Sequence, residues 1–239
     1  KSGLRGHVDG SLRLNLDETW RAGGRLYLTS NDTYLERYKI SDEDTLVSRA
    51  YAEGFWRRSY ALAEAYHFQG LRAEDNQGRI PLVLPKLDFN YVSEPLWQGG
   101  RAFFDANTQL LTRTSGTDSG RLSMTGGWRQ TFDGALDGDR LTLTGQLALD
   151  AYHVRDAEAP PQTVAEDGAF FRAFPQMSLE WSYPFVRAGT GSSILVEPVA
   201  ALVLAPNGGN DEGIPNEDSV NFNFDDTNIW SLNRFPGRD

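Results

Sequence analysis

Residues 175–206, PQMSLEWSYPFVRAGTGSSILVEPVAALVLAP, decide the fold class of this chain. Apolar side chains occupy every second position from Met177 to Phe185, with mostly polar residues between them. Because successive side chains of a strand point to opposite faces, this alternation predicts an amphipathic strand. A turn at 188–193 leads into a second, mostly apolar strand at 194–205, where Pro198 predicts an edge or a bulge. A long acidic loop at 206–218 and strands at 220–224 and 228–232 are expected next.

The same two-residue period runs through the rest of the chain. Residues 3–16, for example, place Leu12 and Leu14 on one face and Arg13 on the other. Further strands are expected at 20–29, 46–57, 60–72, 82–92, 101–113, 120–132, 140–154 and from 170 into the quoted stretch. Pro81 and Pro85 are expected at an edge or bulge. Between the second and third strands, the run from Ser30 to Asp32 is expected to cap a single helical turn over 33–38.

The expected connections alternate between two kinds. The mostly longer, polar ones are 30–45, 74–80, 114–119, 155–168 and 206–219, and the mostly short ones are 17–19, 58–59, 93–100, 133–139 and 187–193. An up-and-down order of strands places all members of one kind on one side, as in outer-membrane barrels. A Greek-key sandwich need not sort its loops in this way. We therefore predict an all-β fold, an incomplete transmembrane β-barrel of about ten or eleven antiparallel up-and-down strands.

The composition says less about the class of protein than the alternation of apolar and polar residues does. The chain has 239 residues and a net charge of −10, and its mean hydropathy is −0.48. These values suit a soluble acidic protein, and they equally suit a barrel whose strands turn one face to a polar lumen. The acidic balance argues against a nucleic-acid partner. The absence of cysteine excludes disulfides and cysteine-based metal sites within this sequence. Because neither an initiator methionine nor a signal peptide is present, we interpret the sequence as a partial chain.

Charged residues gather on the polar faces of the expected strands. The residues that we expect to face the lumen are Arg5, His7, Asp9, Arg13, Arg21, Arg25, Arg101, Asp105, Arg121, Arg129, Glu180 and Glu197. Arg49 lies on such a face as well. The arginines could handle an anionic substrate. They could equally balance lumen carboxylates such as Asp9, Glu53 and Asp105.

Motifs for covalent chemistry or metal binding are absent from the sequence. The three histidines, His7, His67 and His153, are far apart, and no nucleophile–base, zinc or phosphate-loop signature is present. We predict that the chain is not an enzyme and that it holds no cofactor or metal. Carboxylates at 211–212, 217–218 and 225–226 fit either a divalent-cation site or a solvated outer loop. The six tryptophans lie mostly near strand ends, which fits either membrane-interface girdles or ordinary sheet packing.

Several segments resemble one family. Residues 59–95, SYALAEAYHFQGLRAEDNQGRIPLVLPKLDFNYVSEP, are similar to the LptD family of outer-membrane lipopolysaccharide-assembly proteins, most of all to its alphaproteobacterial members. The most specific likeness lies in Glu197-Pro198, in IPNEDS at 214–219 and in NRFPGRD at 233–239. The likeness covers nearly the whole chain.

The resemblance implies a very large barrel that carries a periplasmic jelly-roll domain and is plugged by a lipoprotein, LptE in the family. Lipopolysaccharide would arrive over a periplasmic Lpt bridge and leave through a lateral opening into the outer leaflet of the outer membrane. Residues 1–239 would be the central part of the C-terminal barrel domain, without the jelly roll, the remaining strands or the gate. The alternatives are another outer-membrane barrel, such as a porin or receptor, and a soluble β-sandwich binding module.

Overall fold

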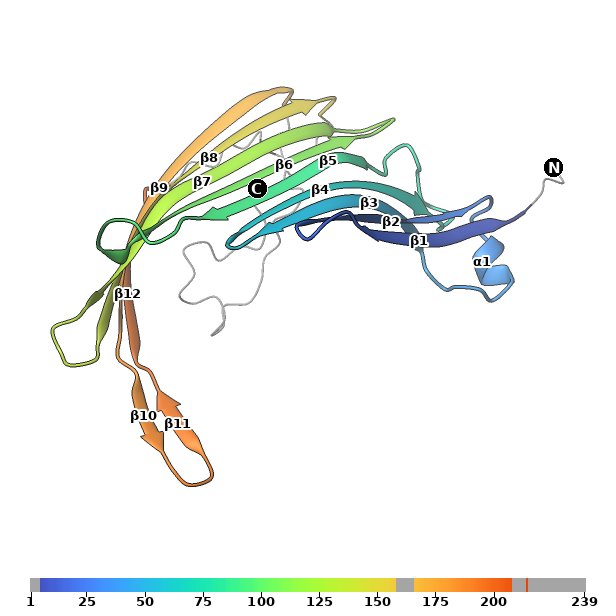
Figure 1. Cartoon of the computed structure of the whole chain (residues 1–239). Coiled ribbons are helices and arrows are strands. Elements are labelled where there is room, and N and C mark those ends of the chain that lie inside the picture. The colour runs from blue at the N-terminus through green and yellow to red at the C-terminus, as the bar shows by residue number, and fades with distance from the viewer. Residues whose placement is uncertain (1–4, 158–165, 208–213, 215–239) are drawn as a thin grey trace.

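Ten strands of the chain form one antiparallel sheet. The computed structural model describes residues 5–157, 166–207 and 214. The sheet runs in the order β1-β2-β3-β4-β5-β6-β7-β8-β9-β12, and β10 pairs separately with β11 (Figure 1). The strands are β1 (His7–Asn15), β2 (Trp20–Thr29), β3 (Thr45–Trp56), β4 (Ser59–Gly70), β5 (Leu82–Val92), β6 (Arg101–Thr112), β7 (Asp118–Asp133), β8 (Arg140–Arg155), β9 (Gly168–Ser182), β10 (Phe185–Ala188), β11 (Ser193–Val196) and β12 (Val199–Leu204). The helical elements are α1 (Tyr34–Arg37) and the 3-10 turn η1 (Trp97–Gly99).

The large sheet is an up-and-down sheet, a single curved layer (Figure 1). Each strand from β1 to β9 pairs with the next strand in the sequence, and β9 then pairs with β12. This arrangement confirms the predicted all-β, antiparallel, incomplete barrel. It also places the loops at 30–44, 71–81 and 113–117, and the described ends 156–157 and 166–167 of the next loop, along one edge, called here the long-loop edge. The turns at 16–19, 57–58, 93–100 and 134–139 lie along the opposite, short-loop edge.

The strand register keeps the two faces in phase across the sheet. Ser11 pairs with Arg25, Arg25 with Arg49, and Arg49 with Tyr66, so polar residues of neighbouring strands fall on one face. On the other face, Phe89 pairs with Ala106 and Leu141 with Trp181. Leu12 and Leu202 on this apolar face are each 61% exposed. Side chains this apolar and this exposed fit a lipid-facing surface.

A small core lies at the long-loop edge. Tyr27 and Leu46 from two strands bury Leu35 of α1, and Tyr34 and Leu71 pack against this group. The predicted helical turn is therefore confirmed. The burial of Leu35 between the helix and the sheet explains why it forms here. The predicted cap is different: Thr33 is the N-cap and makes no side-chain capping bond. Asn31 Oδ1 accepts instead from the Thr33 amide at 3.2 Å.

The predicted hairpin of 177–185 and 194–205 is wrong in its continuity. Both of its strands are interrupted, between β9 and β10 at Tyr183-Pro184 and between β11 and β12 at Glu197-Pro198. Neither proline has a backbone N–H to donate to the sheet, so each strand is interrupted at its proline. The Tyr183 amide donates to the Pro198 carbonyl at 3.1 Å and ties the breaks together. Beyond this point β10 and β11 form a ribbon that extends away from the sheet (Figure 1).

Pro85 lies at an irregularity of β5, as predicted. The register of β5 shifts between Val83 and Lys86 against β6, and the pairing with β4 shifts at the same place. A residue without an N–H fits a position where the ladder is already interrupted. Pro81 immediately precedes β5.

Several predictions lie outside the described residues. They are the strands at 220–224 and 228–232, the carboxylate pairs at 211–212, 217–218 and 225–226, and Trp230. Within the described part of the chain, no helix has both the length and the apolar character needed to cross a membrane.

Candidate functional site

The candidate site is the polar face of the large sheet, where charged side chains bind one another across strands. On β1 and β2, Asp9 Oδ1 and Oδ2 accept from Arg25 Nε and Nη2 at 2.9 and 2.8 Å. Closer to the short-loop edge, Glu53 accepts from Arg21 and, at 3.0 Å, from the hydroxyl of Tyr60. Paired charges of this kind can lie on a partly enclosed surface, because each charge has a partner.

Glu64 of β4 is the centre of the most enclosed group on this face. Its side chain is only 3% exposed. Its Oε1 accepts from Arg49 Nε at 2.7 Å and from the Tyr66 hydroxyl at 2.8 Å. Lys86 Nζ of β5 lies 3.4 Å from Oε2. The carboxylate therefore has partners on its own strand and on both neighbouring strands, β3 and β5.

The network continues with amides and further charges toward β9. Asn107 Nδ2 donates to Asp88 Oδ1 at 2.5 Å, and Asn107 Oδ1 accepts from Arg121 Nη2 at 3.0 Å. Farther along, Arg172 Nε donates to Asp150 Oδ2 at 2.7 Å. The face is thus polar from the first strand to the ninth, and hydrogen bonds link the strands in pairs.

The strand register brings most of the predicted site residues together on this face. His7, Asp9, Arg13, Arg21, Arg25, Arg101, Asp105, Arg121, Arg129 and Glu180 share it. Arg5 precedes β1, and Glu197 lies between β11 and β12, outside the large sheet. The role of these residues as a lumen lining stays a prediction.

The arginines of the polar face were expected to balance Asp9, Glu53 and Asp105, and two of these three carboxylates do pair with arginine. These two are Asp9 and Glu53. Asp105 instead accepts from the Asn90 side chain at 2.5 Å. Three further residues belong to the network although the sequence does not single them out: Glu64, Lys86 and Arg172. Their alternation within the strands was a usable signal, but their partners depend on a register that the sequence does not reveal.

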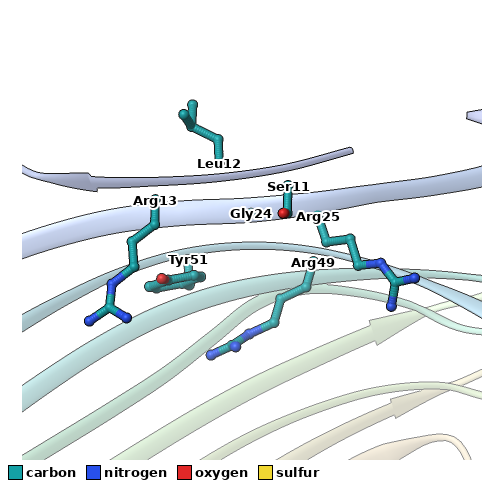
Figure 2. A pocket seen from close by; sticks show the side chains of 7 residues that line it. All are labelled: Ser11, Leu12, Arg13, Gly24, Arg25, Arg49 and Tyr51. Atoms are coloured by element: carbon teal, nitrogen blue, oxygen red, sulfur yellow. The ribbon is translucent and has the colours of Figure 1, made fainter. Parts of the chain in front are cut away.

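A pocket of about 250 Å³ opens on the polar face near β1. Its lining comes from three adjacent strands and consists of Ser11, Leu12, Arg13, Gly24, Arg25, Arg49 and Tyr51. Figure 2 shows the side chains of Arg13, Arg25 and Arg49 on the same side of the sheet as Tyr51, with Leu12 pointing away. Tyr51 lies against Gly23, where an added Cβ would be 2.8 Å from its hydroxyl oxygen. The glycine therefore lets the aromatic ring lie close to the sheet.

The described tryptophans gather at the short-loop edge. Trp20 begins β2, Trp56 ends β3, Trp128 pairs with Ala102 near the start of β6, and Trp181 lies one residue before the end of β9. The register places these four side chains on the apolar face. Trp20 and Trp56 are in edge-to-face contact, with ring centroids 5.2 Å apart. Trp97 lies in η1 at the same edge.

A comparison with models of protein families found a family that matches this chain. The model of the family described as "LptD: LPS transport system D" matches residues 4–239. The chain belongs to the LptD family. LptD-family proteins serve lipopolysaccharide transport and outer-membrane biogenesis together with other Lpt components, and the family is not known for catalysis. A comparison with curated protein sequences found no match.

The two faces of the sheet differ in polarity. The polar face can contact hydrophilic groups, and the apolar face can contact lipid chains. Among the residues that the structure describes, no cluster of three or more His, Cys, Asp or Glu side chains could hold a metal ion. The chemistry that this arrangement supports is reversible polar and ionic contact.

Proposed function

We propose that the chain is the central part of the LptD C-terminal barrel domain and forms part of the outer-membrane translocon that inserts lipopolysaccharide into the outer leaflet. The observation that carries the proposal is the separation of a hydrogen-bonded polar face from an exposed apolar face across ten paired strands. Membership of the LptD family supports lipopolysaccharide as the transported molecule. In the proposal, the polar residues listed above line the lumen and the apolar residues contact membrane lipid.

The tryptophans support an orientation in the outer membrane. Indole rings favour the membrane–water interface, where an apolar ring and a polar N–H both find partners. Trp20, Trp56, Trp128 and Trp181 occupy one edge of the apolar face. The short-loop edge would therefore lie at the periplasmic interface, and the long-loop edge would face the outside, as in other outer-membrane barrels.

The proposal assigns three kinds of partner. Lipopolysaccharide passes along the polar face, and an LptE-like plug lipoprotein fills part of the lumen that this face lines. The periplasmic Lpt bridge delivers the lipid through a jelly-roll domain. Groups such as Arg25 and Arg101 can donate hydrogen bonds either to the plug or to the sugar portion of the lipid.

The test uses the full-length gene in cells. An epitope inserted at Asn210-Asp211, in the expected outer loop, should be accessible on intact cells, whereas one in the turn at 17–19 should not. Depletion of the protein should then reduce lipopolysaccharide at the cell surface. Exposure of the loop with unchanged surface lipopolysaccharide would favour another barrel, such as a porin or receptor. An inaccessible loop would contradict the proposed orientation, in which the long-loop edge faces the outside.

A further inference from the structure

The pocket near β1 combines three guanidinium groups with no carboxylate in its lining. Two rows of paired residues build it. Arg13 pairs with Gly23, which pairs with Tyr51, and in the next row Ser11 pairs with Arg25, which pairs with Arg49. The three arginines therefore follow from backbone register, with Tyr51 between them.

Two of these arginines are held in place and remain partly exposed. Asp9 takes two donors of Arg25, whose side chain keeps 46% of its surface exposed. Arg49 binds Glu64, lies 4.5 Å from the Tyr51 ring centroid and keeps 40% exposed. A guanidinium has five N–H donors, so each can bind another acceptor without giving up its carboxylate.

Arg13 completes the pocket. Its charge acts on Glu53, but that carboxylate already forms an ion pair with Arg21. Arg13 is exposed, and it makes no hydrogen bond or ion pair with any residue in the described ranges. Its side chain extends on the same side of the sheet as those of Arg25 and Arg49 (Figure 2). Asp9 and Glu64 balance the other two arginines from outside the lining, so the pocket keeps an excess positive charge.

We propose that this pocket, formed by Arg13, Arg25, Arg49 and Tyr51, is an anion-binding site for a phosphate or carboxylate group on the sugar portion of the transported glycolipid. Arginine suits both groups because its planar fork donates two parallel hydrogen bonds to oxygen pairs. The Tyr51 ring and hydroxyl can contact the adjoining sugar ring. The inference rests on the proposed function and adds a specific binding site for the lipid on the polar face.

The test uses the full-length protein with its plug lipoprotein, reconstituted in vesicles and loaded with purified lipopolysaccharide. A photo-crosslinking residue is placed at Ser11 in the pocket, at Gln146 elsewhere on the polar face, and at Leu14 on the apolar face. The Ser11 crosslink is compared among wild type, Arg13→Gln, Arg13→Lys and the control Arg57→Gln. Arg57 is 89% exposed in the turn at 57–58, so its loss removes one charge away from the pocket.

We expect the Ser11 probe to capture lipopolysaccharide and Arg13→Gln to reduce the yield about tenfold, the worth of one hydrogen bond to a charged group. Arg13→Lys should keep part of the yield, and Arg57→Gln should keep all of it. Raised salt and added pyrophosphate should also reduce the wild-type yield, which tests the site even if Arg13→Gln fails to assemble. Loss of the crosslink with phosphatase-treated lipid would identify a phosphate, and its persistence would identify a sugar carboxylate.

Other results would overturn the proposal. Capture of the plug lipoprotein at Ser11 would assign the pocket to that protein. Capture of lipid that neither salt, pyrophosphate nor Arg13→Gln changes would show contact without anion binding. Lipid captured at Gln146 but not at Ser11 would refute this site alone. Lipid captured at neither polar position would refute the proposed function itself.

Discussion

Arg49 and Glu64 join β3 to β4 through a hydrogen bond of 2.7 Å between Nε and Oε1, on the face of the sheet that we assign to the lumen. The carboxylate is almost fully covered, whereas the guanidinium is partly exposed. Removing the carboxylate charge would leave Arg49 and Lys86 facing each other without their common partner. This relationship makes Glu64 the residue of the polar face whose substitution should affect stability most directly.

Glu64→Gln should destabilise the folded barrel by about 1–3 kcal/mol, the cost of leaving covered polar groups poorly satisfied. The measurement is the temperature at which the folded form of the full-length protein is lost on semi-native gels. Glu94→Gln is the control, because Glu94 pairs with Arg57 in an exposed ion pair at 3.5 Å. Such pairs contribute little to stability. Equal shifts for the two variants would contradict the role given to Glu64.

Leu12→Arg should reduce assembly into the outer membrane, whereas Arg13→Leu should not. The two residues are neighbours in β1 and lie on opposite faces (Figure 2). A charge on a lipid-facing strand position costs about 2–4 kcal/mol at the midplane of the bilayer. A leucine on the polar face carries no such cost. The amounts of each variant in isolated outer membranes provide the measurement, and an equal loss of both would refute the face assignment.

The sequence alone predicts most strands and their two faces, because apolar and polar residues alternate with a period of two. Residues 7–15 and 20–29, for example, can be assigned to faces without knowledge of their neighbours. The pairing of Arg25 with Arg49 could not be read in this way, since register depends on turn geometry and on packing between strands. The pocket and the Glu64 group therefore appear only when the strands are aligned.

The breaks at Pro184 and Pro198 show a second limit. Pro198 alone indicated an edge or a bulge. That both strands stop at the same level depends on a contact between them, the hydrogen bond from the Tyr183 amide to the Pro198 carbonyl. From the sequence, a continuous strand at 194–205 is the simpler prediction, and it would place Glu197 on a strand face.

Asp44 and Arg72 should make the long-loop edge sensitive to acid. Arg72 Nη2 donates to Asp44 Oδ2 at 2.6 Å, and this hydrogen bond lowers the pKa of Asp44 below its ordinary value of 3.8. Because the folded-state pKa is lowered, the pair stabilises the loops above pH 3.8, and the contribution disappears as the pH falls through the lowered pKa. The pair is exposed, so the effect should be confined to its loops.

Limited proteolysis by an acid-active protease can measure this effect on the loop at 30–44. Cleavage of the wild type should increase on acidification below the ordinary aspartate pKa of 3.8. Within the working range of the protease, Asp44→Asn should raise cleavage above the ordinary aspartate pKa of 3.8 and flatten the pH dependence. Asp42→Asn, a change two residues away in the same loop, should leave the wild-type profile. A profile in which Asp44→Asn retains the full pH dependence would assign the effect to another group.

Trp20, Trp56 and Trp128 should lie at the membrane interface rather than at its centre. They occupy the short-loop edge of the apolar face, and Trp20 packs edge-to-face on Trp56. Variants of the full-length protein that keep one of these tryptophans, with the others changed to phenylalanine, can be reconstituted with lipids brominated at different depths. Quenching should be strongest for bromine near the headgroups. A tryptophan introduced at Leu12, which lies farther from that edge on the same face, should be quenched most by bromine deep in the acyl chains. If all these positions gave the same depth profile, the short-loop edge would not be an interface and the proposed orientation would be lost.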